Sequence, residues 1–176
     1  MSELATLRTT LQEIRRSILE AVEGLPPEES FRPGPAVHPD DGGTYRTGLS
    51  DEEANWSPGR GVNSVATLLF HLAESERYWV CASVGGESFA RNREAEFNTE
   101  PRSLAASVAE YRAAGAAADR VLAGLEDQDL NRLTGGSEPV RAVLLRILVH
   151  HAHHRGQILL LKHLKQAIGN KARQAI

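Results

Sequence analysis

The sequence predicts an all-α protein, an antiparallel four-helix bundle. Apolar residues recur every three or four positions over four long stretches, and these stretches end near glycine or proline. No stretch alternates apolar and polar residues as a β-strand would. Four amphipathic helices bury their apolar faces against one another, and 176 residues suit a single domain. We therefore assign residues 1–168 to one helical domain and residues 169–176 to a frayed C-terminal tail.

The first two predicted helices each carry one apolar stripe. The first covers residues 4–24, with charged residues outside the stripe, and two prolines follow it. The second covers residues 65–84 and ends before two glycines. Asn63 or Ser64 is its N-cap, because a short polar side chain there accepts a hydrogen bond from the N–H groups of the first turn.

A long connection, residues 30–60, separates these two helices. Its four prolines and five glycines leave almost no periodic apolar pattern, apart from a helical turn predicted at residues 51–55. A connection of this length is unusual inside a compact domain. It is either a lid over a pocket or a mobile insertion without a role, and the sequence leaves both interpretations open.

The remaining two predicted helices lie in the C-terminal half. Residues 104–125 form the third, with Ser103 as its N-cap and with alanines and Gly115 that favour close approach to a neighbouring helix. Residues 137–166 form the fourth, which tolerates a proline in its first turn. Gly169 is predicted to end it.

Composition and charge exclude several classes of function. The net charge is −3 and basic residues are scattered among acidic ones, so we expect no nucleic-acid binding. No apolar run reaches the roughly 20 residues that span a bilayer, and the N-terminus lacks the pattern of a signal peptide, so we expect no membrane partner. The single cysteine, Cys81, fits a reducing compartment and a core position. We expect a cytoplasmic protein that acts on a small molecule, and a homodimer is compatible with a short bundle.

The most informative stretch is HHAHHRGQI, residues 150–158. On a helical wheel, His150 and His154 point toward the core, in the direction of the apolar residues of the same helix. His151 lies further from that direction and is interpreted as a supporting or core residue, whereas His153 lies on the flank.

Two buried imidazoles one turn apart need partners for their ring nitrogens. A hydrogen-bonded pair is one solution, and a divalent metal ion is the other, because residues at i and i+4 can direct two nitrogens at one ion. A stable site needs a third ligand from another helix. His71 is the remaining histidine inside a predicted apolar helix, so His71, His150 and His154 are the candidate ligands. Three neutral imidazoles leave an open position on the ion, which is typical of catalytic sites.

These residues resemble a known family. The run NWSPGRGVNSVATLLFHLAESERYW, residues 55–79, together with HHAHHRGQI, is similar to the DinB-like superfamily of four-helix metalloproteins. That superfamily includes bacillithiol- and mycothiol-dependent S-transferases and related isomerases. The resemblance implies that His71, His150 and His154 bind a metal, with zinc or nickel preferred and iron as an alternative. The 30–60 connection looks longer than the family pattern.

The resemblance favours one function over two others. The leading hypothesis is a metal-dependent S-transferase that joins a low-molecular-weight thiol to an electrophilic small molecule, because a coordinating thiol is deprotonated. The second is a metal-dependent small-molecule hydrolase with an activated water. The third is a non-enzymatic, stress-linked module that binds metal or dimerises.

Three further residues are weaker catalytic candidates. Glu74 lies one turn from His71 and is either a base, a residue that orients His71, or a glutamate in a surface salt bridge. Tyr78 is predicted to face the mouth of the pocket, and Gln157 is predicted to be a pocket or supporting group.

Overall fold

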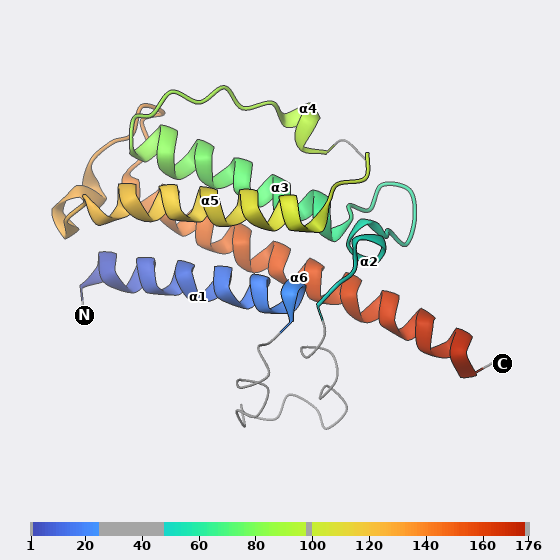
Figure 1. Ribbon diagram of the computed structural model, residues 1–176. Coiled ribbons are helices and arrows are strands. Elements are labelled where there is room, and N and C mark those ends of the chain that lie inside the picture. The colour runs from blue at the N-terminus through green and yellow to red at the C-terminus, as the bar shows by residue number, and fades with distance from the viewer. Residues whose placement is uncertain (1, 25–47, 98–99, 175–176) are drawn as a thin grey trace.

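The computed structural model describes residues 2–24, 48–97 and 100–174, and within these ranges it is helical and contains no strand (Figure 1). The prediction of an all-α fold is confirmed. The elements are α1 (Glu3–Glu23), α2 (Asp51–Asn55), α3 (Val65–Glu76), η2 (Arg77–Val84), α4 (Arg93–Glu96), α5 (Leu104–Ala123), η3 (Asp127–Asn131) and α6 (Val140–Gln174). None of the described helices is both long enough and apolar enough to cross a bilayer.

The predicted helix caps are present in the structure. Ser64 Oγ accepts a hydrogen bond from the backbone N–H of Thr67, and Ser103 Oγ accepts one from that of Ala106. A short helix, α2, occupies the residues where a helical turn was predicted. The rest of the 30–60 connection lies largely outside the described residues, so a lid role for it stays a prediction.

Two helices differ in detail from their predictions. The helix that begins with α3 changes to π-helical hydrogen bonding in η2, where the N–H of Gly85 donates to the carbonyl of Val80 five residues earlier. The last helix does not end at Gly169 but continues to Gln174. A single glycine costs only about 1 kcal/mol in a helix, which the long α6 tolerates. In Figure 1 the C-terminal end of α6 extends beyond the other helices.

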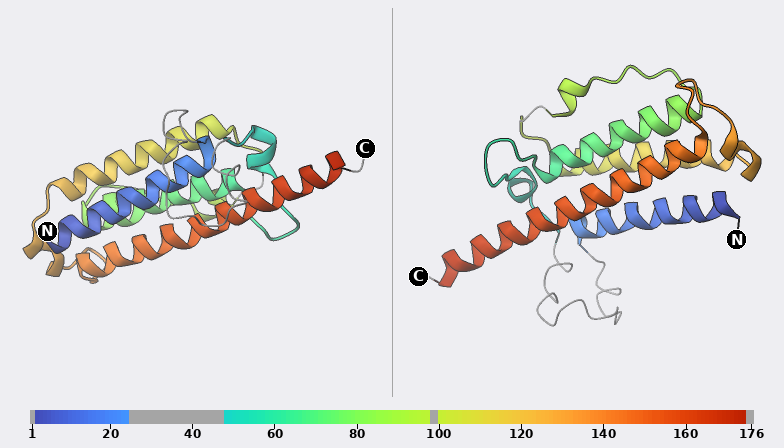
Figure 2. Two further views of the ribbon diagram at one scale, coloured as in Figure 1. Left: turned by 90° about the horizontal axis from the view of Figure 1, so that it is seen from below. Right: turned by 180° about the vertical axis from the view of Figure 1, so that it is seen from behind.

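The four long helices form two pairs that run in opposite directions. α1 and α6 run the same way, and α3 with η2 runs alongside α5 in the reverse direction (Figures 1 and 2). The direction of the long helices therefore does not simply alternate from one to the next along the chain. The reason is residues 86–97 and 100–103, which we call the strap: they lie along the length of the bundle, between the end of η2 and the start of α5 at the end where α3 began. The strap carries α4 along with it.

Two apolar clusters fill the bundle and a polar layer separates them. The first cluster includes Ile18 and Leu69, and the second includes Leu11 and Val143. Each long helix contributes one residue to this layer: Arg15 from α1, Glu76 from α3, Tyr111 from α5 and His151 from α6. All four are at least nine-tenths buried, and Tyr111 also packs within the first cluster.

Charged groups within this layer are paired. Arg15 Nε donates to Glu76 Oε1 at 2.6 Å, and Arg15 Nη1 donates to Asp119 Oδ1 at 2.7 Å. His151 Nε2 lies 2.8 Å from the same Glu76 oxygen. Burial alone would raise the pKa of Glu76, but His151 and Arg15 outweigh it and hold that pKa below its usual value. The carboxylate is therefore ionised in the core and depends on its partners.

Removal of Glu76 is expected to destabilise the fold strongly. Glu76→Ala leaves the buried Arg15 guanidinium without its main counter-charge, and breaking a buried pair in this way costs about 3–5 kcal/mol. Urea unfolding followed by circular dichroism measures the loss. Glu13→Ala, an exposed change on α1, is the control and should stay within about 0.5 kcal/mol of wild type. Equal effects of the two changes would contradict the role assigned to the polar layer.

Candidate metal centre

Three histidine side chains from two helices converge at one point. His71 lies on α3, and His150 and His154 lie one turn apart on α6. Nε2 of His150 is 2.9 Å from Nε2 of His71 and 3.0 Å from Nε2 of His154. The ligand atoms of all three residues lie within 4.8 Å of one another. The structure thus brings together the three residues that the sequence singled out, from positions 79 residues apart.

The outward nitrogens of two of these rings have hydrogen-bond acceptors. His71 Nδ1 lies 2.6 Å from Glu96 Oε2, and His154 Nδ1 lies 2.7 Å from Gln157 Oε1. Each oxygen accepts a hydrogen, so Nδ1 carries the proton and Nε2 of both rings presents a lone pair to the centre. His150 Nε2 faces both lone pairs and can donate at most one hydrogen. At least one Nε2 of the other two rings therefore points its lone pair at a lone pair of His150, with no hydrogen between them.

A divalent cation removes this conflict. Tetrahedral nitrogen ligands at 2.0–2.1 Å from an ion stand about 3.3–3.4 Å apart, a few tenths of an ångström more than the two short Nε2 separations. The residues present therefore fit a metal ion with small adjustments of their side chains. Imidazole nitrogens suit zinc, nickel and iron.

The three rings are held neutral. Burial, together with the neighbouring His154 and His71, lowers the pKa of His150 to about 3. Burial is also the main reason that the pKa of His154 is lowered to about 4, although the hydrogen bond to Gln157 acts in the opposite direction. The pKa of His71 is also lowered, chiefly by burial and against the influence of Glu96. Neutral imidazole is the form that binds metals, so the site is prepared to receive one at neutral pH.

Glu96 orients His71, and the sequence analysis did not single it out. This carboxylate is fully buried under the strap, where Arg91 donates Nε to Oε1 at 2.6 Å and Nη2 to Oε2 at 2.9 Å. Arg91 is itself tied to α3 by a hydrogen bond to Ser75 Oγ at 3.0 Å. Burial alone would raise the pKa of Glu96, but the hydrogen bonds from Arg91 and His71 hold it below its ordinary value.

No periodic signal in the sequence pointed to Glu96, because it lies in a polar stretch between helices. The one local clue is Asn92, whose Oδ1 accepts a hydrogen bond from the N–H of Ala95 and caps the single turn that carries Glu96.

The weaker candidates have different surroundings. Gln157 accepts a hydrogen bond from His154, one of the three candidate ligands. Tyr78 is one step removed, since its ring centre lies 5.3 Å from the guanidinium carbon of Arg91. Glu74 forms an ion pair with Arg77 at 2.8 Å, and it is Glu96 that holds His71. The salt bridge is thus the interpretation of Glu74 that the structure supports, although the pair is partly buried rather than exposed on the surface.

Other predicted assignments are confirmed. His151 is fully buried in the polar layer, with Nδ1 3.0 Å from the carbonyl oxygen of Ile147, and His153 is exposed. Cys81 is buried, and burial raises the pKa of its thiol to about 11, which makes it a poor nucleophile.

A shallow groove of about 560 Å³ lies beside His150 on the outer face of α6. Leu145 and Val149 give it an apolar surface, and Arg146 and His153 stand at its border. Arg146 is paired with Glu138. The groove joins one of the three histidines to solvent.

Comparison with known proteins assigns the family. The sequence model of the DinB superfamily matches residues 44–158, well over half of the chain, and this range includes all three histidines. The chain belongs to the DinB superfamily. A search of curated proteins found no match. The resemblance stated from the two sequence runs is therefore confirmed, and the DinB match also includes Glu96, Arg91 and Gln157.

Glu96 is expected to support metal affinity in this DinB protein. Glu96→Gln removes the negative charge that polarises His71, and loss of such a partner typically weakens metal binding about 10- to 100-fold. Competition with a chromophoric chelator for zinc measures the change. The matched control is Glu94→Gln, which alters an exposed carboxylate on the same short helix. If the two variants bound zinc equally well, the orienting role would be wrong.

The metal-free protein is expected to lose stability in mild acid. His150 and His154 have pKa values near 3 and 4 in the fold, below the ordinary 6.5 of the unfolded chain. Their contribution is complete above pH 6.5 and is lost as the pH falls toward the folded values, since only the unfolded state takes up protons there. Each histidine adds up to about 1.4 kcal/mol per pH unit to the slope.

Chelator-treated protein tests this by urea unfolding between pH 5 and pH 7. His150→Gln should show a smaller slope than wild type, whereas the exposed change His163→Gln should leave the slope unchanged. A slope in His150→Gln equal to that of wild type would argue against a neutral, buried imidazole at this position.

Proposed function

We propose that this DinB protein is a metal-dependent S-transferase that joins a low-molecular-weight thiol to an electrophilic small molecule in the cytoplasm. One observation carries the proposal: three neutral imidazoles converge on a single point and leave no protein group as a fourth ligand among the described residues. A set of three imidazoles with a vacant position is the pattern of catalytic rather than structural metal sites.

His71, His150 and His154 would hold the ion, and zinc or nickel suits them best, with iron as an alternative. A divalent ion at this point would favour the thiolate form of a bound thiol, which is the nucleophilic form. The chain's own residues contribute orientation. Glu96 and Gln157 each fix a tautomer that directs Nε2 inward, and the apolar groove beside His150 offers a surface for an electrophile.

The carboxylates near the site favour a thiol over water as the nucleophile. Many metal hydrolases pair the ion with a carboxylate that takes the proton of the attacking water. Glu96 is engaged by Arg91 and His71, and Glu74 is engaged by Arg77. A thiol is far more acidic than water and would release its proton to solvent on binding an ion, so it depends less on such a base. The hydrolase and the non-enzymatic module are the alternatives that the experiment must separate.

Thiol binding and conjugation test the proposal. Metal-loaded protein is titrated calorimetrically with bacillithiol, mycothiol and glutathione, and conjugation to monochlorobimane is followed by fluorescence. We expect one thiol to bind and to displace chloride from the bimane in a metal-dependent reaction. His154→Ala should lower this rate by at least about 100-fold, because loss of a ligand costs more than loss of its supporting partner.

The exposed change His163→Ala should leave the rate unchanged. Failure of all three thiols to bind would overturn the proposal. Metal-dependent cleavage of p-nitrophenyl esters without any thiol would point instead to the hydrolase.

A further inference from the structure

The outer side of α6, away from the core, carries most of the exposed apolar side chains. Among the described residues seven large apolar side chains are exposed, and five of them lie on α6. These five are exposed by 41% to 70%: Leu145, Val149, Leu160, Leu164 and Ile168. The first four fall within about 100° of one another around the helix. Together with the exposed residues between them, they form what we call the α6 face: Leu145, Val149, Ala152, His153, Gly156, Leu160 and Leu164.

The charged side chains of this part of α6 turn away from the α6 face. Arg155 Nε donates to the Ser17 hydroxyl at 2.6 Å, and Lys162 Nζ donates to the carbonyl of Ala21 at 2.7 Å. Both cations therefore contact α1. Residues 147–164 contain no other Lys, Arg, Asp or Glu. The α6 face consequently presents only apolar, small and imidazole side chains.

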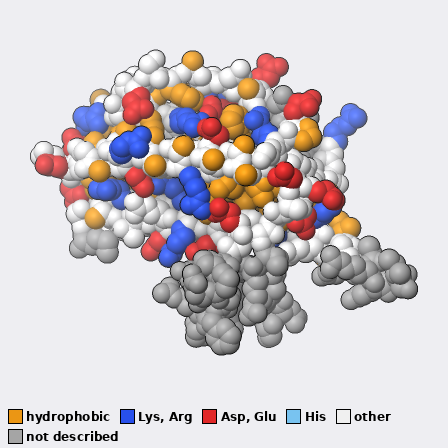
Figure 3. Space-filling view, in the orientation of Figure 1, with side chains coloured by type: hydrophobic (Ala, Val, Ile, Leu, Met, Phe, Trp, Pro, Cys, Tyr) orange, Lys and Arg blue, Asp and Glu red, His pale blue; other side chains and the backbone are white. Residues whose placement is uncertain are grey.

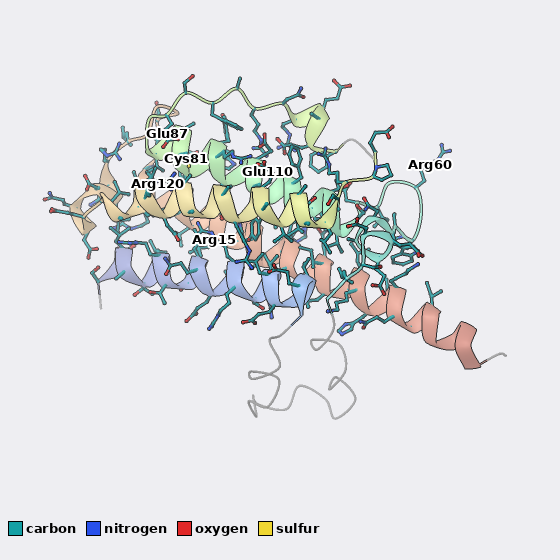
Figure 4. All side chains as sticks on the ribbon, in the orientation of Figure 1. Arg15, Arg60, Cys81, Glu87, Glu110 and Arg120 are labelled. Atoms are coloured by element: carbon teal, nitrogen blue, oxygen red, sulfur yellow. The ribbon has the colours of Figure 1, made fainter. Side chains whose placement is uncertain are left out.

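The opposite side of the molecule differs in composition. There α5 exposes Glu110 and Arg120, which Figure 4 labels, and charged side chains are scattered over the side that Figure 3 shows. The right-hand view of Figure 2 is turned by 180° and has α6 toward the viewer. A surface helix normally carries charged residues opposite its core-facing stripe, whereas a helix that is apolar on both sides is covered on both sides. The α6 face therefore favours a partner.

A second copy of the α6 face is complementary to the first. If two α6 helices pack antiparallel across a two-fold axis, residues at equal sequence distances from the axis lie opposite one another. With the axis midway between residues 154 and 155, Leu145 meets the partner's Leu164, and Val149 meets the partner's Leu160. Large apolar side chains thus pair at both ends of the α6 face, and neither pairing brings like charges together.

The centre of the α6 face allows two helices to approach closely. In this pairing Gly156 lies opposite the partner's His153, and a Cβ added to Gly156 would meet nothing within 4 Å in a single chain. Glycine inside a helix costs about 1 kcal/mol relative to alanine, and close approach of another backbone is one use of it. The large apolar side chains of the face expose on the order of 500 Å² per copy, so a dimer would bury about 1,000 Å², near the lower size of specific interfaces.

We propose that this protein is a dimer in which the α6 faces of two copies pack antiparallel across a two-fold axis. The groove beside His150 shares Leu145, Val149 and His153 with the α6 face, so the partner's Leu160 would lie over it. Each metal centre would then have beside it one apolar wall from the other copy. That this wall contacts an electrophile rests on the function proposed above, whereas the dimer itself does not.

Sedimentation of the full-length protein tests the dimer, and its readout is independent of metal and of thiol binding. From about 1 to 100 µM the mass should rise toward twice the 19.2 kDa of one chain. Leu160→Asp places an unpaired charge in the apolar contact and should raise the dissociation constant at least about 100-fold. Leu133→Asp is the matched control and should leave it unchanged, because Leu133 is exposed to 60%, as Leu160 is to 58%, but lies outside α6.

Disulfide formation between copies tests the antiparallel pairing. In a Cys81→Ala background, the double variant Val149→Cys/Leu160→Cys should form a covalent dimer on mild oxidation, because these two positions face each other between copies. Either single variant should not, since a rise of 1.5 Å per residue places the same position of the two copies about 16 Å apart.

Several results would overturn the proposal. The first is a protein that stays monomeric at about 100 µM, and the second is a dimer that persists in both Leu160→Asp and Val149→Asp. Dissociation of Leu133→Asp as readily as Leu160→Asp would contradict the location, and single-cysteine variants that cross-link as fast as the double variant would contradict the antiparallel pairing. A monomer that binds phosphatidylcholine vesicles and loses this binding in Leu160→Asp would assign the α6 face to a membrane surface instead.

Discussion

Buried imidazole nitrogens favour a hydrogen-bond partner or a cation, and this preference shapes the metal centre of the protein. At the metal centre, Glu96 and Gln157 occupy the outward nitrogens of two rings, which turns their lone pairs toward His150. The inward nitrogens then oppose one another, and an ion is the simplest resolution. The next residue of α6, His151, has different surroundings: its Nδ1 lies 3.0 Å from the carbonyl oxygen of Ile147, and its Nε2 lies 2.8 Å from Glu76 Oε1. Adjacent histidines of one sequence run thus serve two separate networks.

The two networks have opposite electrostatic designs. The polar layer joins ionised partners from α1, α3 and α5: Arg15 pairs with Glu76 in the core and with the partly exposed Asp119. The metal centre is formed by neutral rings whose pKa values burial has lowered, so any positive charge there must come from outside the chain. The first network holds the helices together, while the second leaves a defined place for an ion. Their separation allows the site to be changed without removing the charged pairs of the core.

The sequence predicted the parts of this arrangement that depend on periodicity. The helical spacing of 3.6 residues places His150 and His154 on the buried side of α6, and it identifies His71 as the matching residue of another helix. Residues without a periodic context were not predictable in the same way. Glu96 lies on a single turn within a polar stretch, and its role depends on how the strap crosses the bundle. The relative directions of the individual helices were not predictable either, because a pattern of apolar residues does not show that α3 and α5 run the same way.

The strap has a consequence for how this protein can vary. Arg91 donates two hydrogen bonds to the carboxylate of Glu96, which in turn holds His71. This contact depends on the spacing of the two residues, so an inserted or deleted residue between them would displace it. The exposed residues 86–88, near the start of the strap, carry no such constraint and can change in length at little cost. The strap thus has one segment whose length can vary, residues 86–88, and one whose length is fixed by its contacts, Arg91 to Glu96. Relatives that differ in strap length should differ in the first segment and keep the six residues from Arg91 to Glu96 intact.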